Sequence, residues 1–361
     1  MKSKIEELDI VRAFAMIGVL LIHGTSQATV SLAVKSTTHN LFLAVNRFSL
    51  FAVPVFLMLS ALVLFYRYGD EWDAGRIRSF YSKRIKFILL PYLIWSVVYY
   101  TYNYIWPKLK LGLPWQPGEM AANFLERLLL GQNGPHLYYF ILMFQLYLIF
   151  PLLMSLAKRL RRAPMLFIAL CVAINAAFYL FTYWYTPRYG PIPQRATYIF
   201  GYMGLIGVGA MIGMHYHRFV QRLDRLKLAP IGFMAISGSA LVLCYLLSYW
   251  GIYRPQTITF DIVFHLHALF SAAAFITLSR WLLRRHRPLS RMFTSLGSAS
   301  FGIYLTHVLI LSILRNTIEL PSTTAGYSLY TFGFIVITTA VSWIFVKMAR
   351  KWKYQWILFG R

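Results

Sequence analysis

Arg12 and His23 are ionisable residues inside the first hydrophobic segment of the chain. In an α-helix, the eleven steps between them overshoot three turns by only about 20°, so both side chains lie on one face, about 16 Å apart. A central Arg costs roughly 2.5 to 3.5 kcal/mol in a bilayer. This face must therefore contact protein or a water-filled cavity, and it indicates where the chain does chemistry.

His23 has the side chain best suited to acid–base chemistry, because imidazole exchanges a proton near neutral pH. Arg12, near one surface, is suited to a phosphate group. Each residue also has a structural alternative. His23 can hydrogen-bond a neighbouring helix, and Arg12 can extend to the interface.

A second polar stripe lies late in the chain, at Ser300, Tyr304 and His307. The spacings of four and three residues place all three on one helix face. A polar stripe that takes part in chemistry is one interpretation, and hydrogen bonding between helices is the other.

Lys83, Arg84 and Lys86 form a basic cluster that enters the third apolar segment. Such a cluster is typical of anchoring at the inner membrane surface. It becomes a binding surface if the ligand is anionic and rich in phosphate.

A further set of polar residues flanks the opposite ends of the apolar segments. It is expected to form a site for an acceptor substrate, or simply to be solvated helix ends. Its spacings are not diagnostic of a metal site, so no metal is predicted, and Cys171 and Cys244 are expected to be buried thiols. The set comprises His136, Glu119, Glu126, Asp261, His265 and His267.

The composition predicts a polytopic membrane protein. Of the 361 residues, 58% are hydrophobic and 13% are charged, whereas a soluble domain has about 25% charged residues. Mean hydropathy is +0.57. The prediction is one all-α transmembrane domain over residues 1–361, with no separate soluble domain.

Ten apolar segments approach the length of about 20 residues that spans a membrane. They fall at roughly 10–33, 41–66, 87–106, 137–157, 164–184, 197–215, 229–250, 259–283, 295–315 and 326–348.

The positive charge alternates from loop to loop. Most of the 36 Lys and Arg residues lie at the two ends of the chain and in every second loop, which predicts that both termini are cytoplasmic. Orientation and contact with anionic lipid thus account for much of the net charge of +25, and nucleic-acid binding is excluded. Two loops are expected to be long: a basic inner one at 67–86, and an outer one at 107–136 with an amphipathic piece at Glu119–Leu130.

Several short motifs resemble the membrane-bound acyltransferase 3 family, whose members O-acylate sugars of the cell envelope. Arg12 and His23 match its R-x(10)-H signature, and Leu8 and Asp9 precede them as in the family. The other similar blocks, in family order, are 54–61, 80–92, 136–139 and 300–307. Ala61 and Phe87 depart from the usual Gly and Arg, and the second change leaves the role of the basic cluster uncertain.

The resemblance implies an acyl-CoA donor, with acetyl-CoA expected, an extracytoplasmic carbohydrate acceptor and a catalytic His23. Arg12, Lys83, Arg84 and Lys86 would then hold the nucleotide phosphates. Tyr304 and His307 are candidate donors to an oxyanion. His136, Glu126, Asp261 and His265 are candidate acceptor-binding residues.

Two other functions stay open. Arg12 and His23 could line the path of a polysaccharide or small-molecule transporter, although the chain has no evident internal repeat. A succinyltransferase of the same fold is the second. Under every interpretation the expected location is the plasma membrane, in contact with lipid; a partner enzyme or a second copy is neither indicated nor excluded.

Overall fold

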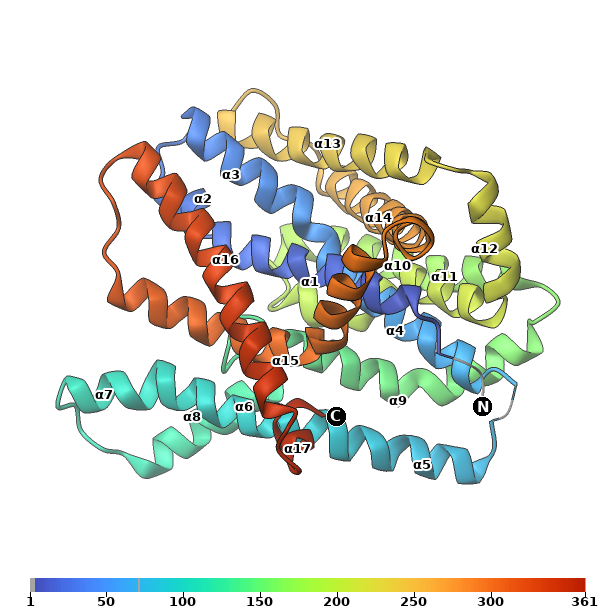
Figure 1. Cartoon of the computed structure of the whole chain (residues 1–361), viewed down its shortest axis with the longest axis horizontal. Coiled ribbons are helices and arrows are strands. Elements are labelled where there is room, and N and C mark those ends of the chain that lie inside the picture. Colours follow the sequence, from blue (N-terminus) through green and yellow to red (C-terminus); the bar gives the residue numbers. More distant parts are fainter. Residues whose placement is uncertain (1–3, 71, 361) are drawn as a thin grey trace.

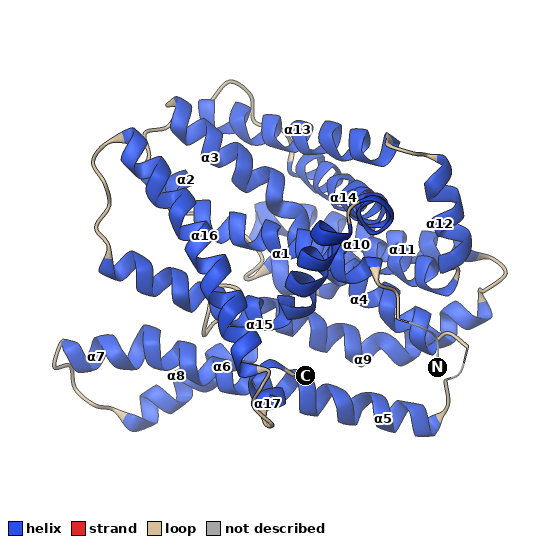
Figure 2. Cartoon of the chain, in the orientation of Figure 1, coloured by secondary structure: helices blue, strands red, loops and turns tan. Residues whose placement is uncertain are grey.

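The structure is a computed structural model and describes residues 4–70 and 72–360. Within these residues it contains helices and no strands (Figure 2). The predicted all-α class is therefore confirmed.

The α-helices, in chain order, are α1 (Glu7–Thr25), α2 (Ala28–Ser31), α3 (Thr37–Phe48), α4 (Ala52–Tyr68), α5 (Ala74–Arg84), α6 (Leu90–Tyr100), α7 (Trp106–Lys110), α8 (Pro117–Leu130), α9 (Tyr138–Arg159), α10 (Pro164–Tyr189), α11 (Met203–Met214), α12 (Tyr216–Arg225), α13 (Ala229–Trp250), α14 (Thr257–Arg285), α15 (Arg287–Thr317), α16 (Thr324–Ala349) and α17 (Gln355–Phe359).

Nine helical stretches of the described chain are long and apolar enough to cross a membrane. A tenth candidate is a broken one, because the helical stretch Ile199–Met214 meets α12 at an angle of 100°. Ten predicted spans therefore correspond to nine helical stretches and one bent pair, which confirms a multi-pass membrane protein. The cytoplasmic placement of the termini stays a prediction.

The predicted inner loop at 67–86 is wrong for most of its length. Asp73 caps α5 by accepting a hydrogen bond from the backbone N–H of Arg76 at 2.8 Å, and the π-helical turn Ile85–Leu89 joins α5 to α6. The segment holds good helix formers and no breaker until Pro91, which the first turn of α6 tolerates. The predicted amphipathic piece of the outer loop is confirmed as α8.

Helix α1 runs through the middle of the bundle (Figure 1). Its Ile10, Val11, Ala13, Ala15 and Met16 are fully buried, against α15, α14, α4, α16 and α3. A segment with protein on nearly every side can carry ionisable residues without exposing them to lipid.

Helices α1 and α15 touch at the backbone. A Cβ atom added at Gly297 would lie 1.7 Å from the carbonyl oxygen of Asp9, so only glycine fits there. Small residues that let two helices approach closely are typical of packing inside membranes. This crossing fixes α15 against α1.

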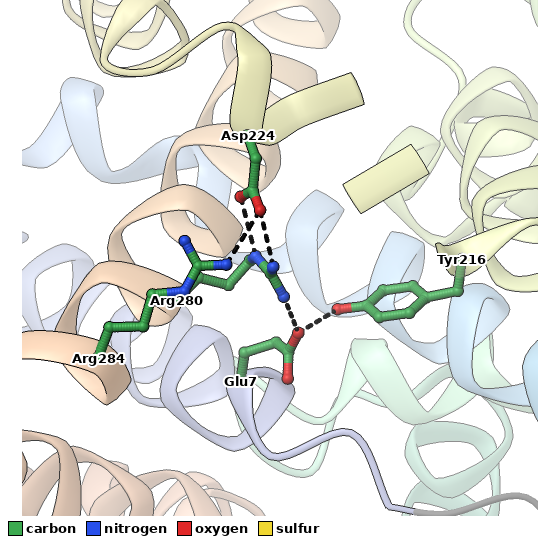
Figure 3. A network of polar contacts seen from close by, with 5 residues as sticks. All are labelled: Glu7, Tyr216, Asp224, Arg280 and Arg284. Carbon is green, nitrogen blue, oxygen red and sulfur yellow. Dashed lines mark hydrogen bonds and ion pairs between the residues drawn. The ribbon is translucent and has the colours of Figure 1, made fainter. Parts of the chain in front are cut away.

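A polar network holds the beginning of α1 (Figure 3). The carboxylate of Glu7 accepts hydrogen bonds from Arg280 at 2.9 Å and from the Tyr216 hydroxyl at 3.0 Å. Arg280 also donates to both carboxylate oxygens of Asp224, at 3.1 and 2.9 Å, and Arg284 donates to one of them at 3.0 Å. The network joins α1, α12 and α14 and so limits rotation of the helix that carries Arg12 and His23.

Candidate functional site

Three histidines from distant parts of the sequence meet inside the helical bundle. The ring centroids of His23 and His307 are 5.1 Å apart, those of His136 and His307 5.2 Å, and those of His23 and His136 6.3 Å. All three pairs meet edge to face. We call His23, His136 and His307 the histidine cluster.

Each member comes from a different kind of element. His23 lies in the last turns of α1, His307 in the middle of α15, and His136 in the short segment between α8 and α9. That segment begins with Gly131, which has a φ of 70°. A Cβ atom there would lie 2.8 Å from the Cα atom of Tyr138, so glycine allows the tight turn that brings His136 back into the bundle.

Hydrogen bonds fix the orientation of His307. Its Nδ1 lies 3.0 Å from the carbonyl oxygen of Ile303 and 2.8 Å from that of Tyr304. Carbonyls only accept, so Nδ1 carries the proton, and in the neutral ring the lone pair is on Nε2. That Nε2 atom is buried and has no hydrogen-bond partner among the residues that the structure describes.

Buried polar atoms of His136 and of Asn133, three residues before it, are unsatisfied. Within the described part of the chain, neither ring nitrogen of His136 and neither side-chain amide atom of Asn133 has a hydrogen-bond partner. Buried polar groups are nearly always hydrogen-bonded, so an exception needs a reason. A polar ligand or water that completes these bonds is the natural reason, and Asn133 is a residue that the sequence did not single out.

Tyrosines enclose the histidine cluster. The Tyr304 hydroxyl donates to the carbonyl oxygen of His136, and the Tyr304 ring lies 5.0 Å from the imidazole. The Tyr99 ring lies 4.9 Å from the same imidazole, and its hydroxyl donates to the carbonyl of Leu305 at 2.8 Å. These bonds tie α6, α15 and the segment before α9 together around His136.

Arg315 is a second residue that sequence reasoning missed. It donates to the carbonyl oxygens of His23 at 2.8 Å and of Gly24 at 3.1 Å. These carbonyls lie near the end of α1, where intrahelical donors run out. The sequence offered one signal for Arg315, a cationic residue in the last turn of an apolar helix.

Two tyrosines of other helices lead toward the histidine cluster. The rings of Tyr139 and Tyr304 are 5.6 Å apart. Tyr304 then contacts His136. A line of aromatic hydroxyl side chains thus approaches the histidine cluster.

Arg12 is not free in this structure. It donates to the carboxylate of Asp9 at 2.6 Å, and Lys4 pairs with the same carboxylate at 2.5 Å. Asp9 is 3% exposed. A phosphate that binds Arg12 therefore competes with Asp9 or adds to this ion pair.

The basic cluster at the start of the third span divides between two environments. The Arg84 guanidinium lies over the rings of Phe80 and Tyr147, 5.0 Å from each. Lys86 lies 4.4 Å from the Trp356 ring, and Lys83 is exposed. In the described chain, no hydrogen bond or ion pair joins these three residues to Arg12.

The four residues predicted to bind an acceptor are dispersed. His136 is in the histidine cluster, and Glu126 is exposed on α8. Asp261 pairs with Arg195 at 2.5 Å, and the Nδ1 atom of His265 lies 2.7 Å from the Asp261 carbonyl oxygen. Among residues 4–70 and 72–360, no hydrogen bond, ion pair or ring contact connects these three places.

The histidine cluster does not have the arrangement of a metal centre. Over the described part of the chain, no three or more His, Cys, Asp or Glu side chains are placed to hold a metal ion. The rings meet edge to face instead.

Comparison with known proteins points to one family. The family model described as "Acyltransferase domain" matches residues 5–347. A curated relative, the "Probable poly-beta-1,6-N-acetyl-D-glucosamine export protein" of Staphylococcus aureus (strain MRSA252), is 22% identical over 270 residues, which are 73% of this chain and 70% of the relative. No solved structure matches the chain.

Proposed function

The chain belongs to the acyltransferase 3 family, and from this premise we propose that it moves an acyl group from acyl-CoA to a hydroxyl of an envelope polysaccharide, wall polymer or glycolipid. Acetyl is the proposed acyl group. The observation that carries this proposal is the histidine cluster, in which imidazoles from α1, α15 and the segment before α9 share one buried space.

His23 is the proposed catalytic base. His136 and His307 are 1% and 0% exposed, whereas His23 is half-buried and is thus the member that a substrate can reach. A base must come within hydrogen-bond distance of the proton that it removes. Access therefore favours His23 over its two neighbours.

The proposed reaction needs no group beyond the two substrates and the imidazole. His23 takes the proton of the acceptor hydroxyl, and the hydroxyl oxygen attacks the carbonyl carbon of the thioester. The C–S bond then breaks, and the leaving thiolate receives the proton from His23. The products are an ester and free CoA, and His23 is neutral again. A short-lived acyl-imidazole at His23 is the variant that proceeds in two displacements.

His136 is the proposed donor to the oxyanion of the tetrahedral intermediate. The Tyr304 hydroxyl is occupied by the His136 carbonyl, and the Nδ1 proton of His307 is occupied by carbonyls of its own helix. His136 has an N–H without a partner. A donor aimed into a water-poor site is typically the largest electrostatic contribution to such chemistry.

The proposed donor path starts at Arg12. Arg12 and the exposed Lys83 and Lys86 are suited to the nucleotide phosphates, and the line through Tyr139 and Tyr304 leads toward the histidine cluster. Arg84 is half-buried against aromatic rings and would position this surface rather than touch phosphate. Burial of the thioester along the line would limit its hydrolysis.

An export function is the second candidate, and the name of the Staphylococcus aureus relative favours it. Export requires passage of a glycan through the bundle, whereas acyl transfer requires consumption of a thioester. Purified protein in proteoliposomes, given [14C]acetyl-CoA and glycan acceptors from the host envelope, separates the two. Labelled, alkali-labile ester on the glycan supports acyl transfer; glycan movement without label in the ester supports export.

A further inference from the structure

A long apolar groove opens between α10, α11 and α14, apart from the histidine cluster. Its volume is about 790 Å³. Its apolar walls include Val172, Leu180, Leu205, Val208 and Leu269. The part of α10 that lines it extends from Val172 to Pro187, about 22 Å at 1.5 Å per residue. Because one leaflet of hydrocarbon is about 15 Å thick, the groove is long enough for a lipid chain.

One end of the groove is polar. Arg195 pairs there with Asp261 at 2.5 Å, and the Arg195 guanidinium lies 4.7 Å from the centre of the Tyr179 ring. The nitrogens of His265 lie 2.7 Å from the Asp261 carbonyl oxygen and 2.8 Å from that of Gly201.

The charge around this end is positive. Arg188 is adjacent to the lining residue Pro187, and Arg254 is three residues before the lining residue Thr257. In the segments 186–200 and 250–262, Asp261 is the only carboxylate, against three arginines. An anionic headgroup fits this end, and a hydrocarbon chain fits the rest.

We propose that this groove binds one anionic phospholipid of the surrounding bilayer. Its phosphate lies at Arg195, and one acyl chain lies in the apolar part of the groove along α10. The second chain remains in the bilayer. This site is independent of the proposed acyl transfer, because its residues are not those of the histidine cluster.

The test compares two lipids with the same acyl chains. The detergent-purified full-length protein is titrated with phosphatidylglycerol or phosphatidylcholine, and bound lipid is counted by native mass spectrometry alongside Tm. We expect phosphatidylglycerol to be retained about fivefold better, the factor that one basic residue near an anionic lipid contributes. Equal retention of the two lipids would overturn the proposal.

Two variants test the two ends of the groove. Ala176→Phe projects a ring from the exposed, groove-lining face of α10, and should remove retention of both lipids. Ala177→Phe is the matched control, because Ala177 is exposed on the same helix outside the groove, and should leave retention unchanged. If the two variants retain equal amounts of lipid, the acyl chain of the lipid does not occupy the groove.

The double variant Arg195→Gln with Asp261→Asn removes the ion pair without leaving an unpaired buried charge. It leaves the net charge unchanged and removes the guanidinium that would donate to the phosphate. We expect the preference for phosphatidylglycerol to fall to about one, while Arg78→Gln on the distant α5 preserves it. A preference that survives the double variant overturns the placement of the headgroup.

Discussion

His23 and His307 lie with their ring centroids 5.1 Å apart although 283 residues separate them. The two rings meet at 62°, close to edge to face. The Nε2 atom of His307 has no partner in the described structure. A second buried imidazole therefore lies directly beside the half-buried His23.

His23→Ala is expected to abolish acyl transfer while the protein still inserts and folds. General-base catalysis contributes typically 10²- to 10⁴-fold, so transfer from labelled acetyl-CoA should fall at least about a hundredfold. His286→Ala is the control, because His286 is exposed at the junction of α14 and α15. Turnover of His23→Ala within a factor of a few of wild type would remove His23 from the mechanism.

Arg315→Ala is expected to lower both stability and activity. The change leaves the carbonyls of His23 and Gly24 without their donor, which costs about 1 to 3 kcal/mol for each buried acceptor left unsatisfied. Tm in detergent measures the loss of stability, and the kcat of acyl transfer measures the displacement of His23. Arg315→Lys, which retains one donor group, should recover part of both; an unchanged Tm in Arg315→Ala would contradict this role.

Gly297→Ala is expected to disrupt the crossing of α1 and α15. The new Cβ atom would meet the Asp9 carbonyl at 1.7 Å, so the helices must separate, and overpacking of this kind costs about 1 to 3 kcal/mol. Gly333→Ala on α16 is the matched control, because nothing lies within 4 Å of its added Cβ. Tm and size-exclusion profiles should show loss for the first variant and none for the second; equal behaviour of the two would show that the crossing tolerates a methyl group.

The network at Glu7 predicts a pH dependence of stability. Hydrogen bonds from Arg280 and then Arg284 hold the pKa of Asp224 below its usual range. A carboxylate with a lowered pKa in the folded state stabilises the fold above its ordinary pKa, and this contribution disappears as pH falls through the lowered value. The Tm difference between wild type and Asp224→Asn should therefore be present at pH 7 and decrease below about pH 4.

That pH series has its own control. Arg280→Gln removes two of the hydrogen bonds that lower the pKa of Asp224. The difference in Tm that Asp224→Asn causes at pH 7 should therefore be smaller in this background than in wild type. An equal difference in both backgrounds would show that Asp224 contributes to stability without Arg280.

The sequence by itself determined the class of the fold, the approximate spans and the common face of Arg12 and His23. These follow from local rules: apolar length sets a membrane span, and helix periodicity sets which residues share a face. The same rules failed at 67–86, where charge suggested a loop. Charged residues are good helix formers and continue a helix beyond the membrane when nothing breaks it.

Only the tertiary structure decided which polar residues meet. Periodicity places His307 on the face of Tyr304, but it carries no information about which helix that face contacts. His136 reaches the histidine cluster through the turn at Gly131, and Arg315 reaches His23 from another helix. Asp261 and His265 lie with Arg195 in the apolar groove between α10, α11 and α14, away from the histidine cluster. Such contacts depend on how the helices cross, as α15 crosses α1 at Gly297 and Asp9. Packing over the whole bundle sets these crossings.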